Sequence, residues 1–186
     1  MDGWQCDIQI ADGSLPTPGI YGVPEQWPHI AALYLRNGFN PDRSEIVFLA
    51  NVIQLIGPAE PPLRGLRGRR IVGINGTRFV AMLDGHEYGQ IEVERLDQPE
   101  RRVGPALADI GNLWVDENHQ RQGIGTWLVH QAGRWLALGG AIQLLAYATP
   151  DETALISFLE RTGFENDHHH PTSVDPVDAA LDTGAA

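Results

Sequence analysis

The sequence predicts an α/β fold with a mixed, mostly antiparallel sheet flanked by helices, and three observations lead to this prediction. Short strand patterns with turn-forming residues between them occupy the middle of the chain, over residues 71–94. A further strand pattern over residues 110–115 is followed by a long amphipathic helix pattern. The chain has 186 residues, of which 42% are hydrophobic and 20% charged, and this suits one hydrophobic core in a globular protein.

The central strand patterns predict an antiparallel meander. Residues 71–74 and 77–83 flank Asn75-Gly76, a pair typical of a two-residue type I′ hairpin, and Asp84-Gly85 offers a second turn before residues 90–94. In the next strand, Ile110 and Val115 would lie on opposite faces if the strand were regular. One extra residue near Gly111-Asn112 would bring them to the same face, so we predict a β-bulge there.

A glycine-containing turn, residues 120–125, lies between that strand and the helix pattern. The apolar residues that follow recur at helical spacing until Gly139-Gly140 ends the run. The free N–H groups at the start of a helix, with the positive end of its dipole, suit a phosphate or pyrophosphate. The turn has neither the Walker pattern nor the Rossmann glycine spacing.

Residues 109–125 resemble the acetyl-CoA-binding motif of the GNAT superfamily, the general N-acetyltransferases. Residues 154–164, a helix pattern that ends in Gly163-Phe164, resemble the second signature of that superfamily. With the strands before them, the two motifs cover residues 70–165. The resemblance implies a strand near 109–115 that splays from its neighbour, acetyl-CoA entering the gap as co-substrate, and direct acetyl transfer to an amine.

The resemblance also implies which residues contact acetyl-CoA. A backbone N–H on the splayed strand, at Leu113 or Val115, would polarise the carbonyl of the thioester. The side chain of Arg121 would add positive charge near the pyrophosphate. The backbone amides that would hold the pyrophosphate are those of Gln120, Arg121, Gln122, Gly123, Gly125 and Thr126.

Acetyl transfer to an amine needs a group that removes a proton from an ammonium whose pKa is about 10.4. Asp109 is the first candidate, because it stands eleven residues before Gln120, where the histone-acetylating branch of the family has a glutamate base. The alternative is an ordinary acidic residue at a strand start. Glu92 and Glu94 share one face of the preceding strand and are further candidate bases, or part of a solvated face.

The chain departs from the family pattern at Leu159. Many GNAT enzymes have a tyrosine there, which protonates the leaving thiolate, and leucine has no proton to give. Tyr147, at the end of the strand pattern over 142–147, is the candidate replacement, with aromatic packing over the cofactor as its alternative role. Direct protonation of the thiolate by water or by the acceptor ammonium is the other alternative. The departure keeps a second function open, an acetyl-CoA-binding or regulatory module with little or no turnover.

A weaker repeat predicts the domain organisation. Residues 30–39 align without gaps onto residues 155–164, and a strand pattern follows at 45–49. We therefore predict a partial GNAT-like C-terminal segment over 1–60, the acetyl-CoA-binding domain over 65–166 and a disordered tail over 167–186. A chain that is part of a larger tandem protein is the alternative. Residues 40–56 would cover the open sheet edge of the domain, either within the chain or across a homodimer.

Composition narrows the class of partner. The net charge of −11 argues against a nucleic-acid partner held by phosphate contacts. No apolar run approaches the roughly 20 residues that span a bilayer, so no membrane partner is expected. The single Cys6 excludes an internal disulfide and suits the cytoplasm. The three histidines at 168–170 are expected to be solvated, with no metal site, and the expected partner is a small-molecule or peptide amine.

Overall fold

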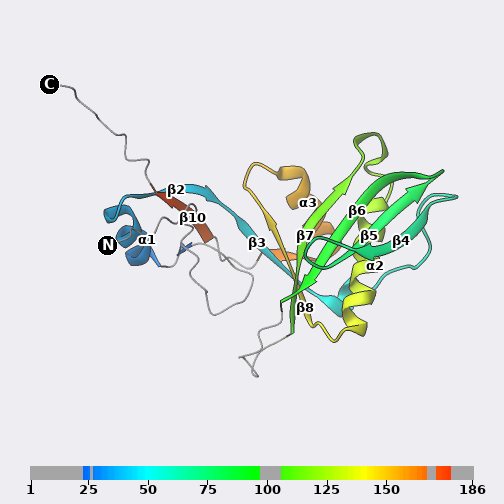
Figure 1. Cartoon of the computed structure of the whole chain (residues 1–186), viewed down its shortest axis with the longest axis horizontal. Helices are drawn as coiled ribbons and strands as arrows, with labels where there is room; N and C mark the ends of the chain where they lie inside the picture. The colour runs from blue at the N-terminus through cyan, green and yellow to red at the C-terminus, as the bar shows by residue number, and fades with distance from the viewer. Residues whose placement is uncertain (1–22, 26, 97–105, 167–170, 177–186) are drawn as a thin grey trace, which may run out of the picture.

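The computed structural model describes residues 23–25, 27–96, 106–166 and 171–176, which form two sheets and three α-helices (Figure 1). The larger sheet has the strand order β4-β5-β6-β7-β8-β3-β9, and all its neighbouring pairs are antiparallel except β7 and β8. This architecture confirms the predicted mixed, mostly antiparallel fold. In chain order, its strands are β3 (Ile46–Asn51), β4 (Arg67–Val72), β5 (Thr77–Leu83), β6 (His86–Arg95), β7 (Leu107–Val115), β8 (Gln143–Ala148) and β9 (Glu165–Asn166).

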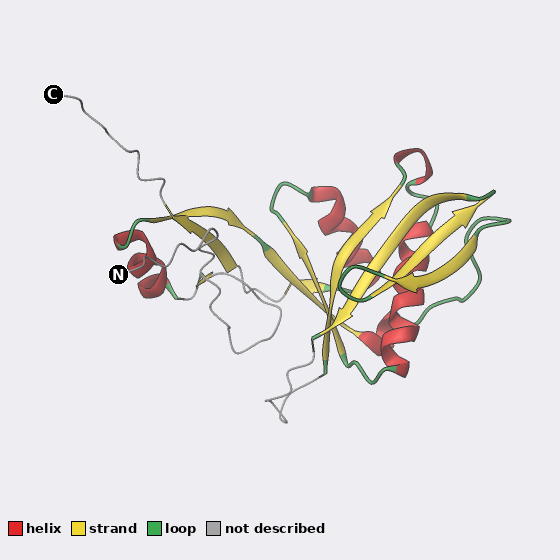
Figure 2. Ribbon diagram, in the orientation of Figure 1, coloured by secondary structure: helices red, strands yellow, loops and turns green. Residues whose placement is uncertain are grey.

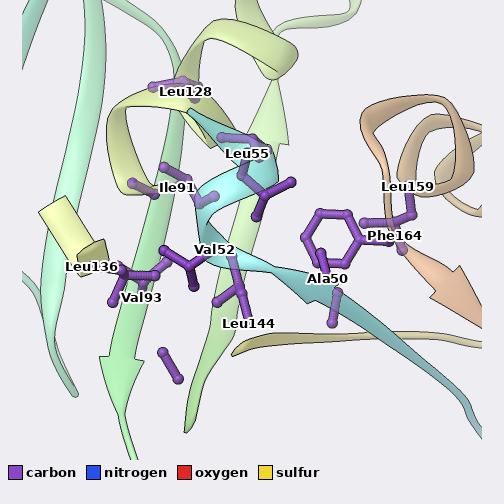
Figure 3. Packing of buried hydrophobic residues seen from close by; sticks show 14 of the residues in the cluster. Ala50, Val52, Leu55, Ile91, Val93, Leu128, Leu136, Leu144, Leu159 and Phe164 are labelled. Carbon is purple, nitrogen blue, oxygen red and sulfur yellow. The ribbon is translucent and has the colours of Figure 1, made fainter. Parts of the chain in front are cut away.

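Two helices pack against the larger sheet (Figure 2). Helix α2 (Ile124–Leu138) lies against β5, β6 and β7, and α3 (Thr153–Thr162) lies beside β8 and β9. A short 3₁₀ helix, η1 (Val52–Leu55), follows β3 in the chain and packs against α2. The apolar side chains of these elements form the larger of two buried clusters, of which Figure 3 labels Ala50, Val52, Leu55, Ile91, Val93, Leu128, Leu136, Leu144, Leu159 and Phe164.

The β4–β5 connection differs from the predicted two-residue hairpin. The strands pair from Val72 and Thr77 onward, so four residues connect them, and the N–H of Gly73 donates to the carbonyl of Gly76 at 2.8 Å. Neither Asn75 nor Gly76 has the positive φ that a type I′ turn requires, so the predicted turn type is wrong. A long-range contact explains the difference, because the Glu92 carboxylate accepts the N–H of Asn75 at 2.8 Å.

The second turn, between β5 and β6, has the geometry predicted for hairpins of this kind. Asp84 has φ 49° and Gly85 has φ 82°, both in the left-handed region, and these are the two residues between the strands. A two-residue turn of this type matches the twist of the strands that it joins. The Asp-Gly pair therefore forms the tight turn of the sheet.

The predicted β-bulge is present at Gly111. Glu92 pairs with Asn112 and the next residue, Val93, pairs with Ile110, so Gly111 has no partner on β6. The extra residue shifts the alternation of β7. As a result, Ile110 and Val115 both pack against the core, as the sequence predicted.

The first part of the chain has two roles. Helix α1 (Pro28–Arg36) leads into β2 (Phe39–Ser44), which belongs to a small sheet with the order β1-β10-β2, where β1 is Val23–Pro24 and β10 is Pro171–Pro176. Strand β3 instead enters the larger sheet between β8 and β9, and so covers the edge of β8 within the chain. The sequence predicts a disordered tail over 167–186; within that range the structure describes only β10.

No helix in the described ranges is long and apolar enough to cross a membrane.

We expect Leu144→Ala to lower the free energy of unfolding by about 2–5 kcal/mol, because the Leu144 side chain is 0% exposed and its loss leaves a cavity in the core. Leu138→Ala is the matched control: Leu138 is 85% exposed at the end of α2, and its loss should cost less than about 0.5 kcal/mol. Urea denaturation measures both. Equal losses would contradict the described packing of β8.

Candidate functional site

The site begins where β7 and β8 part. The parallel pairing of these strands covers only Leu107 to Asp109 on β7 and Gln143 to Leu145 on β8. Beyond Asp109, β6 is the only partner strand of β7 in the described sheet. The strands therefore separate as the sequence predicted. On the side of β7 that faces away from β6, backbone N–H and C=O groups beyond Asp109 form no hydrogen bonds to a described strand.

A cavity of about 690 Å³ lies beside the separated end of β7. Three segments line it: the end of β7, the glycine loop (residues 116–123, between β7 and α2) with the first turn of α2, and one face of α3 together with the residue before it. The lining residues are Leu113, Trp114, Val115, His119, Gln120, Arg121, Gly123, Ile124, Gly125, Thr126, Glu152, Ala154, Leu155, Phe158, Arg161 and Thr162.

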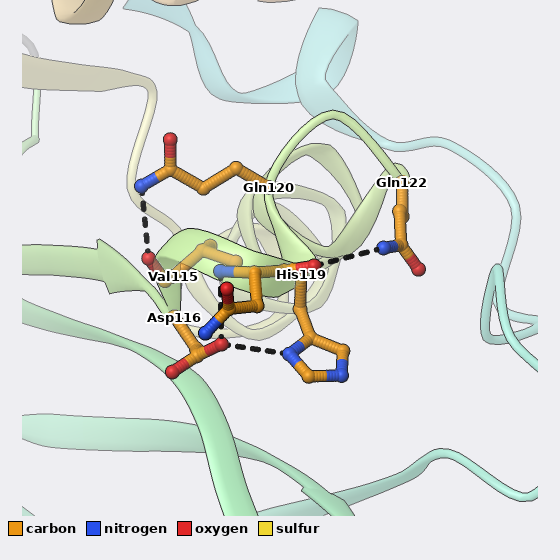
Figure 4. Close-up of polar contacts among 6 residues, drawn as sticks. Val115, Asp116, His119, Gln120 and Gln122 are labelled. Carbon is orange, nitrogen blue, oxygen red and sulfur yellow. Dashed lines mark hydrogen bonds and ion pairs between the residues drawn. The ribbon is translucent and has the colours of Figure 1, made fainter.

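The glycine loop is held by contacts within itself (Figure 4). Its 3₁₀ helix, η2 (Glu117–His119), is capped by Asp116, whose carboxylate accepts the N–H of Asn118 at 3.1 Å and contacts His119 Nδ1 at 2.7 Å. These two contacts with the His119 ring and the Asn118 backbone hold the pKa of Asp116 below its usual range. The side-chain amide of Gln120 donates to the carbonyl of Val115 at 3.1 Å. These contacts fix the shape of the loop.

The start of α2 has unclaimed donors. Gly123 precedes the helix with φ 85°, a conformation that favours glycine, and has no side chain to cap the helix. The first N–H groups of a helix have no intrahelical partner, and the helix dipole adds positive potential there. This end of α2 lies in the cavity wall, so the cavity offers a site for an anion.

The phenyl ring of Phe158 fixes how closely α3 approaches the loop. A Cβ at Gly125 would lie 3.2 Å from that ring, tighter than most real contacts. Glycine at this position therefore allows α3 to form the opposite wall of the cavity.

The predicted acetyl-CoA contacts gather at this cavity, with one difference. Gln122 is not in the lining, and its side-chain amide donates to the carbonyl of Asn118 at 3.3 Å. The α3 wall was not predicted. Residues 154, 155, 158, 161 and 162 follow helical spacing, so the periodicity of this segment could have indicated a common face but not what it faces. The predicted residues that line the cavity are Leu113, Val115, Gln120, Arg121, Gly123, Gly125 and Thr126.

Asp109 lies at the point where the strands part, outside the cavity lining. It is cross-strand from Glu94, and its Oδ1 is buried with no hydrogen-bond partner among the described residues. Burial first, and then the charge of Glu94, raises the pKa of Asp109 to about 6. Its carboxyl group can therefore change its charge near neutral pH.

Tyr147 also lies outside the cavity lining. On β8, it pairs with Val47 of β3 and packs beside the buried Val47 and Leu145. Leu145 is the register partner of Asp109, so strand alternation places Asp109 and Tyr147 on the same face of the sheet. The predicted cofactor contacts and the two predicted proton-transfer residues thus lie in separate places.

Glu92 has a structural role that the sequence did not indicate. It is 5% exposed, and its carboxylate pairs with Arg78 at 2.8 Å besides accepting the N–H of Asn75. The backbone hydrogen bond and the Arg78 pair hold the pKa of Glu92 below its ordinary value despite burial. Glu92 is therefore not on a solvated face, and these contacts make it a poor candidate for the base.

In the part of the chain that the structure describes, no group of three or more His, Cys, Asp or Glu side chains is placed to hold a metal ion. The three histidines at 168–170 lie outside that part.

Comparison with known families and structures agrees with this arrangement. The family model described as an acetyltransferase (GNAT) domain matches residues 75–166. A tandem GNAT protein from the clavulanic acid biosynthesis pathway has TM-score 0.64 at 14% identity, over 89% of this chain and 62% of that one. A GCN5-related N-acetyltransferase from Kribbella flavida has TM-score 0.61 at 15% identity, over 85% and 68%. A Drosophila protein has TM-score 0.60 at 16% identity, over 84% and 59%.

At these identities the solved structures show a shared fold. The chain spans less than two-thirds of two of them, 59% and 62% of their lengths. The comparison with curated protein sequences gives no match.

We expect the Asp109 carboxyl to titrate with a midpoint near pH 6, and Glu94→Gln to lower that midpoint by removing the neighbouring charge. Because the folded pKa lies above the ordinary value of 3.8, ionised Asp109 destabilises the fold, and stability falls as pH rises from about 4 to 6. Asp109→Asn should therefore stabilise the protein more at pH 8 than at pH 4. Carboxyl-carbon NMR and thermal unfolding measure these effects, and a midpoint near 4 would contradict the burial.

Proposed function

Since this chain belongs to the GNAT superfamily through residues 75–166, we propose that it is an acetyl-CoA-dependent N-acetyltransferase that moves the acetyl group directly to an amine. The observation that carries the proposal is the cavity, in which an anion-binding helix start and the unpaired side of a splayed strand form adjoining walls. Acetyl-CoA supplies a reactive acetyl thioester when bound. The acceptor is a small-molecule or peptide amine.

The residues of the cavity fit the chemistry of this co-substrate. The open N–H groups at residues 123–126 and the side chain of Arg121 suit the pyrophosphate. The backbone of β7 at Leu113 and Val115 suits an amide-containing chain and a thioester carbonyl, because backbone N–H groups polarise a carbonyl without reorganising. The volume of about 690 Å³ lies in the usual range for small-molecule sites.

Proton transfer is assigned to residues at the parting strands. Asp109 is our candidate base. A general base works best when its pKa lies near the working pH, and the raised pKa of Asp109, about 6, meets this condition. Above pH 6 the carboxyl group is ionised and can accept a proton. Leu159 is 1% exposed in the core and has no proton to donate. Tyr147, on the same face as Asp109, is our candidate to protonate the leaving thiolate.

A second candidate function is a module that binds acetyl-CoA without turnover. Two observations favour it: Leu159 stands where many relatives have the tyrosine acid, and neither Asp109 nor Tyr147 lines the cavity. The two functions share the cavity and differ only in whether an amine consumes the bound acetyl group.

Calorimetry with acetyl-CoA and CoA, beside a thiol-release assay over a panel of amines, tests the proposal. We expect binding and amine-dependent thiol release, with kcat/KM falling as pH drops below about 6 because Asp109 becomes protonated. Asp109→Asn should lower kcat by about 10²–10⁴ and leave acetyl-CoA binding intact. Tyr147→Phe should also lower kcat.

Asp84→Asn, in the β5–β6 turn, is the matched control and should change neither reading. Binding without thiol release for any amine would favour the non-catalytic module. If neither ligand binds, the cavity has another role. If Tyr147→Phe retains full turnover, Tyr147 is not the acid.

A further inference from the structure

Helix α3 presents a cation to the cavity that the proposed function has not used. Arg161 lines the cavity from the last turn of α3. Arg161 is an exposed residue, and no hydrogen bond or ion pair holds its side chain among the described residues. The cavity lining contains one other arginine, Arg121 of the glycine loop.

The position of Arg161 along α3 relates it to the anion-binding end of the cavity. Phe158, one turn earlier on the same face, lies against Gly125 in the first turn of α2. Glu152, the cavity-lining acid, lies at the opposite end of α3, where its carboxylate accepts the N–H of Thr149 at 2.7 Å. The two ends of the α3 wall therefore carry opposite charges, and the positive end lies one turn beyond the contact with the helix start.

We infer that Arg161 binds a phosphate of the nucleotide half of the co-substrate, and so makes the cavity select coenzyme A thioesters over pantetheine thioesters. This inference rests on the proposed function. A guanidinium can form two parallel hydrogen bonds to a phosphate, and these are stronger than bonds between neutral groups. Coenzyme A has two such targets, the pyrophosphate and the 3′-phosphate, whereas pantetheine has neither.

The test is calorimetry on Arg161→Gln with acetyl-CoA, acetyl-dephospho-CoA and acetyl-pantetheine. We expect about tenfold weaker binding of acetyl-CoA and unchanged binding of acetyl-pantetheine, because only the phosphate contact is lost. Acetyl-dephospho-CoA separates the two targets: a loss similar to that of acetyl-CoA assigns the pyrophosphate, and no loss assigns the 3′-phosphate. Arg36→Gln, at the matching position of α1, is the control and should change no affinity.

Unchanged acetyl-CoA binding by Arg161→Gln would overturn the inference, and so would an equal loss for acetyl-pantetheine, which indicates a packing role. Either result leaves the proposed function standing. Failure of the unaltered protein to bind any of the three ligands would overturn the proposed function, and this inference with it.

A separate observation concerns the strands that follow α1 and α3. Helix α3 leads into β9, and the strand beside β9, antiparallel to it and to β8, is β3. Helix α1 leads into β2, and the strand beside β2, antiparallel to it and to β1, is β10. The orders β8-β3-β9 and β1-β10-β2 are therefore the same arrangement.

The two helix–strand units are α1 with β2 and α3 with β9. In each arrangement the middle strand is the one that follows the other unit in the chain. Strand β3 follows β2 in the chain yet pairs with β9, and β10 follows β9 yet pairs with β2. We propose that two equivalent helix–strand units exchange their following strands within one chain. On this proposal the predicted partial segment over 1–60 ends with the strand that closes the sheet of the acetyl-CoA-binding domain.

Engineered cysteine pairs test the exchange in the full chain with Cys6→Ser. The variant Asn40→Cys with Asp175→Cys joins register partners of β2 and β10, and should oxidise to a disulfide within one chain. The control, Glu165→Cys with Asp175→Cys, reports an unexchanged β9–β10 hairpin and should remain reduced. A disulfide in the control, a first pair that links two chains on a non-reducing gel, or no disulfide in either would overturn the exchange.

Discussion

The parting of β7 from β8 after Asp109 is the constraint on which the rest of the structure depends. Backbone N–H and C=O groups need hydrogen-bond partners when they are buried, and β7 has a partner strand on one side only along most of its length. The bulge at Gly111 keeps the apolar side chains of β7 on the core face while the strand bends away. This divergence separates the strands β4 to β7 from the strands β8, β3 and β9. The cavity and the position of Asp109 both follow from it.

The glycine loop stays in place because a second segment is tied across α2. The indole N–H of Trp127 donates to the carbonyl of Ala59 at 3.0 Å, and Arg134 donates to the carbonyls of Gly57 and Pro58. Further along the same segment, Pro62 lies so close to Gly123 that a Cβ there would approach within 3.1 Å. The connection from η1 to β4 therefore supports the loop from outside, and links the core under α2 to the end of the cavity where α2 begins.

Charge on the face of the sheet opposite α2 is handled in two ways. Glu92 is compensated by Arg78 and a backbone N–H, so its charge is stable when buried. Asp109 is not compensated: a buried oxygen and the neighbouring Glu94 both disfavour its charge. Two carboxylates on adjacent strands thus differ in kind, one holding a loop and the other able to exchange a proton near neutral pH. Such a contrast is typical of sites where one acid is structural and the other reactive.

The sequence by itself determined the local features, since these depend on neighbours along the chain. Helical periodicity located α2, the glycines indicated the turn that precedes it, and the slipped alternation of β7 predicted the bulge. Tertiary structure decided what depends on distant contacts. A hydrogen bond from Asn75 to Glu92, seventeen residues away, set the β4–β5 connection against the preference of Asn-Gly. The packing of Phe158 against Gly125 makes one face of α3 a wall of the cavity. The strand that pairs with β9 in the larger sheet is β3, from earlier in the chain, and not a strand that follows β9. Burial beside Glu94 raised the pKa of Asp109, because charge and solvent exposure depend on which strands become neighbours.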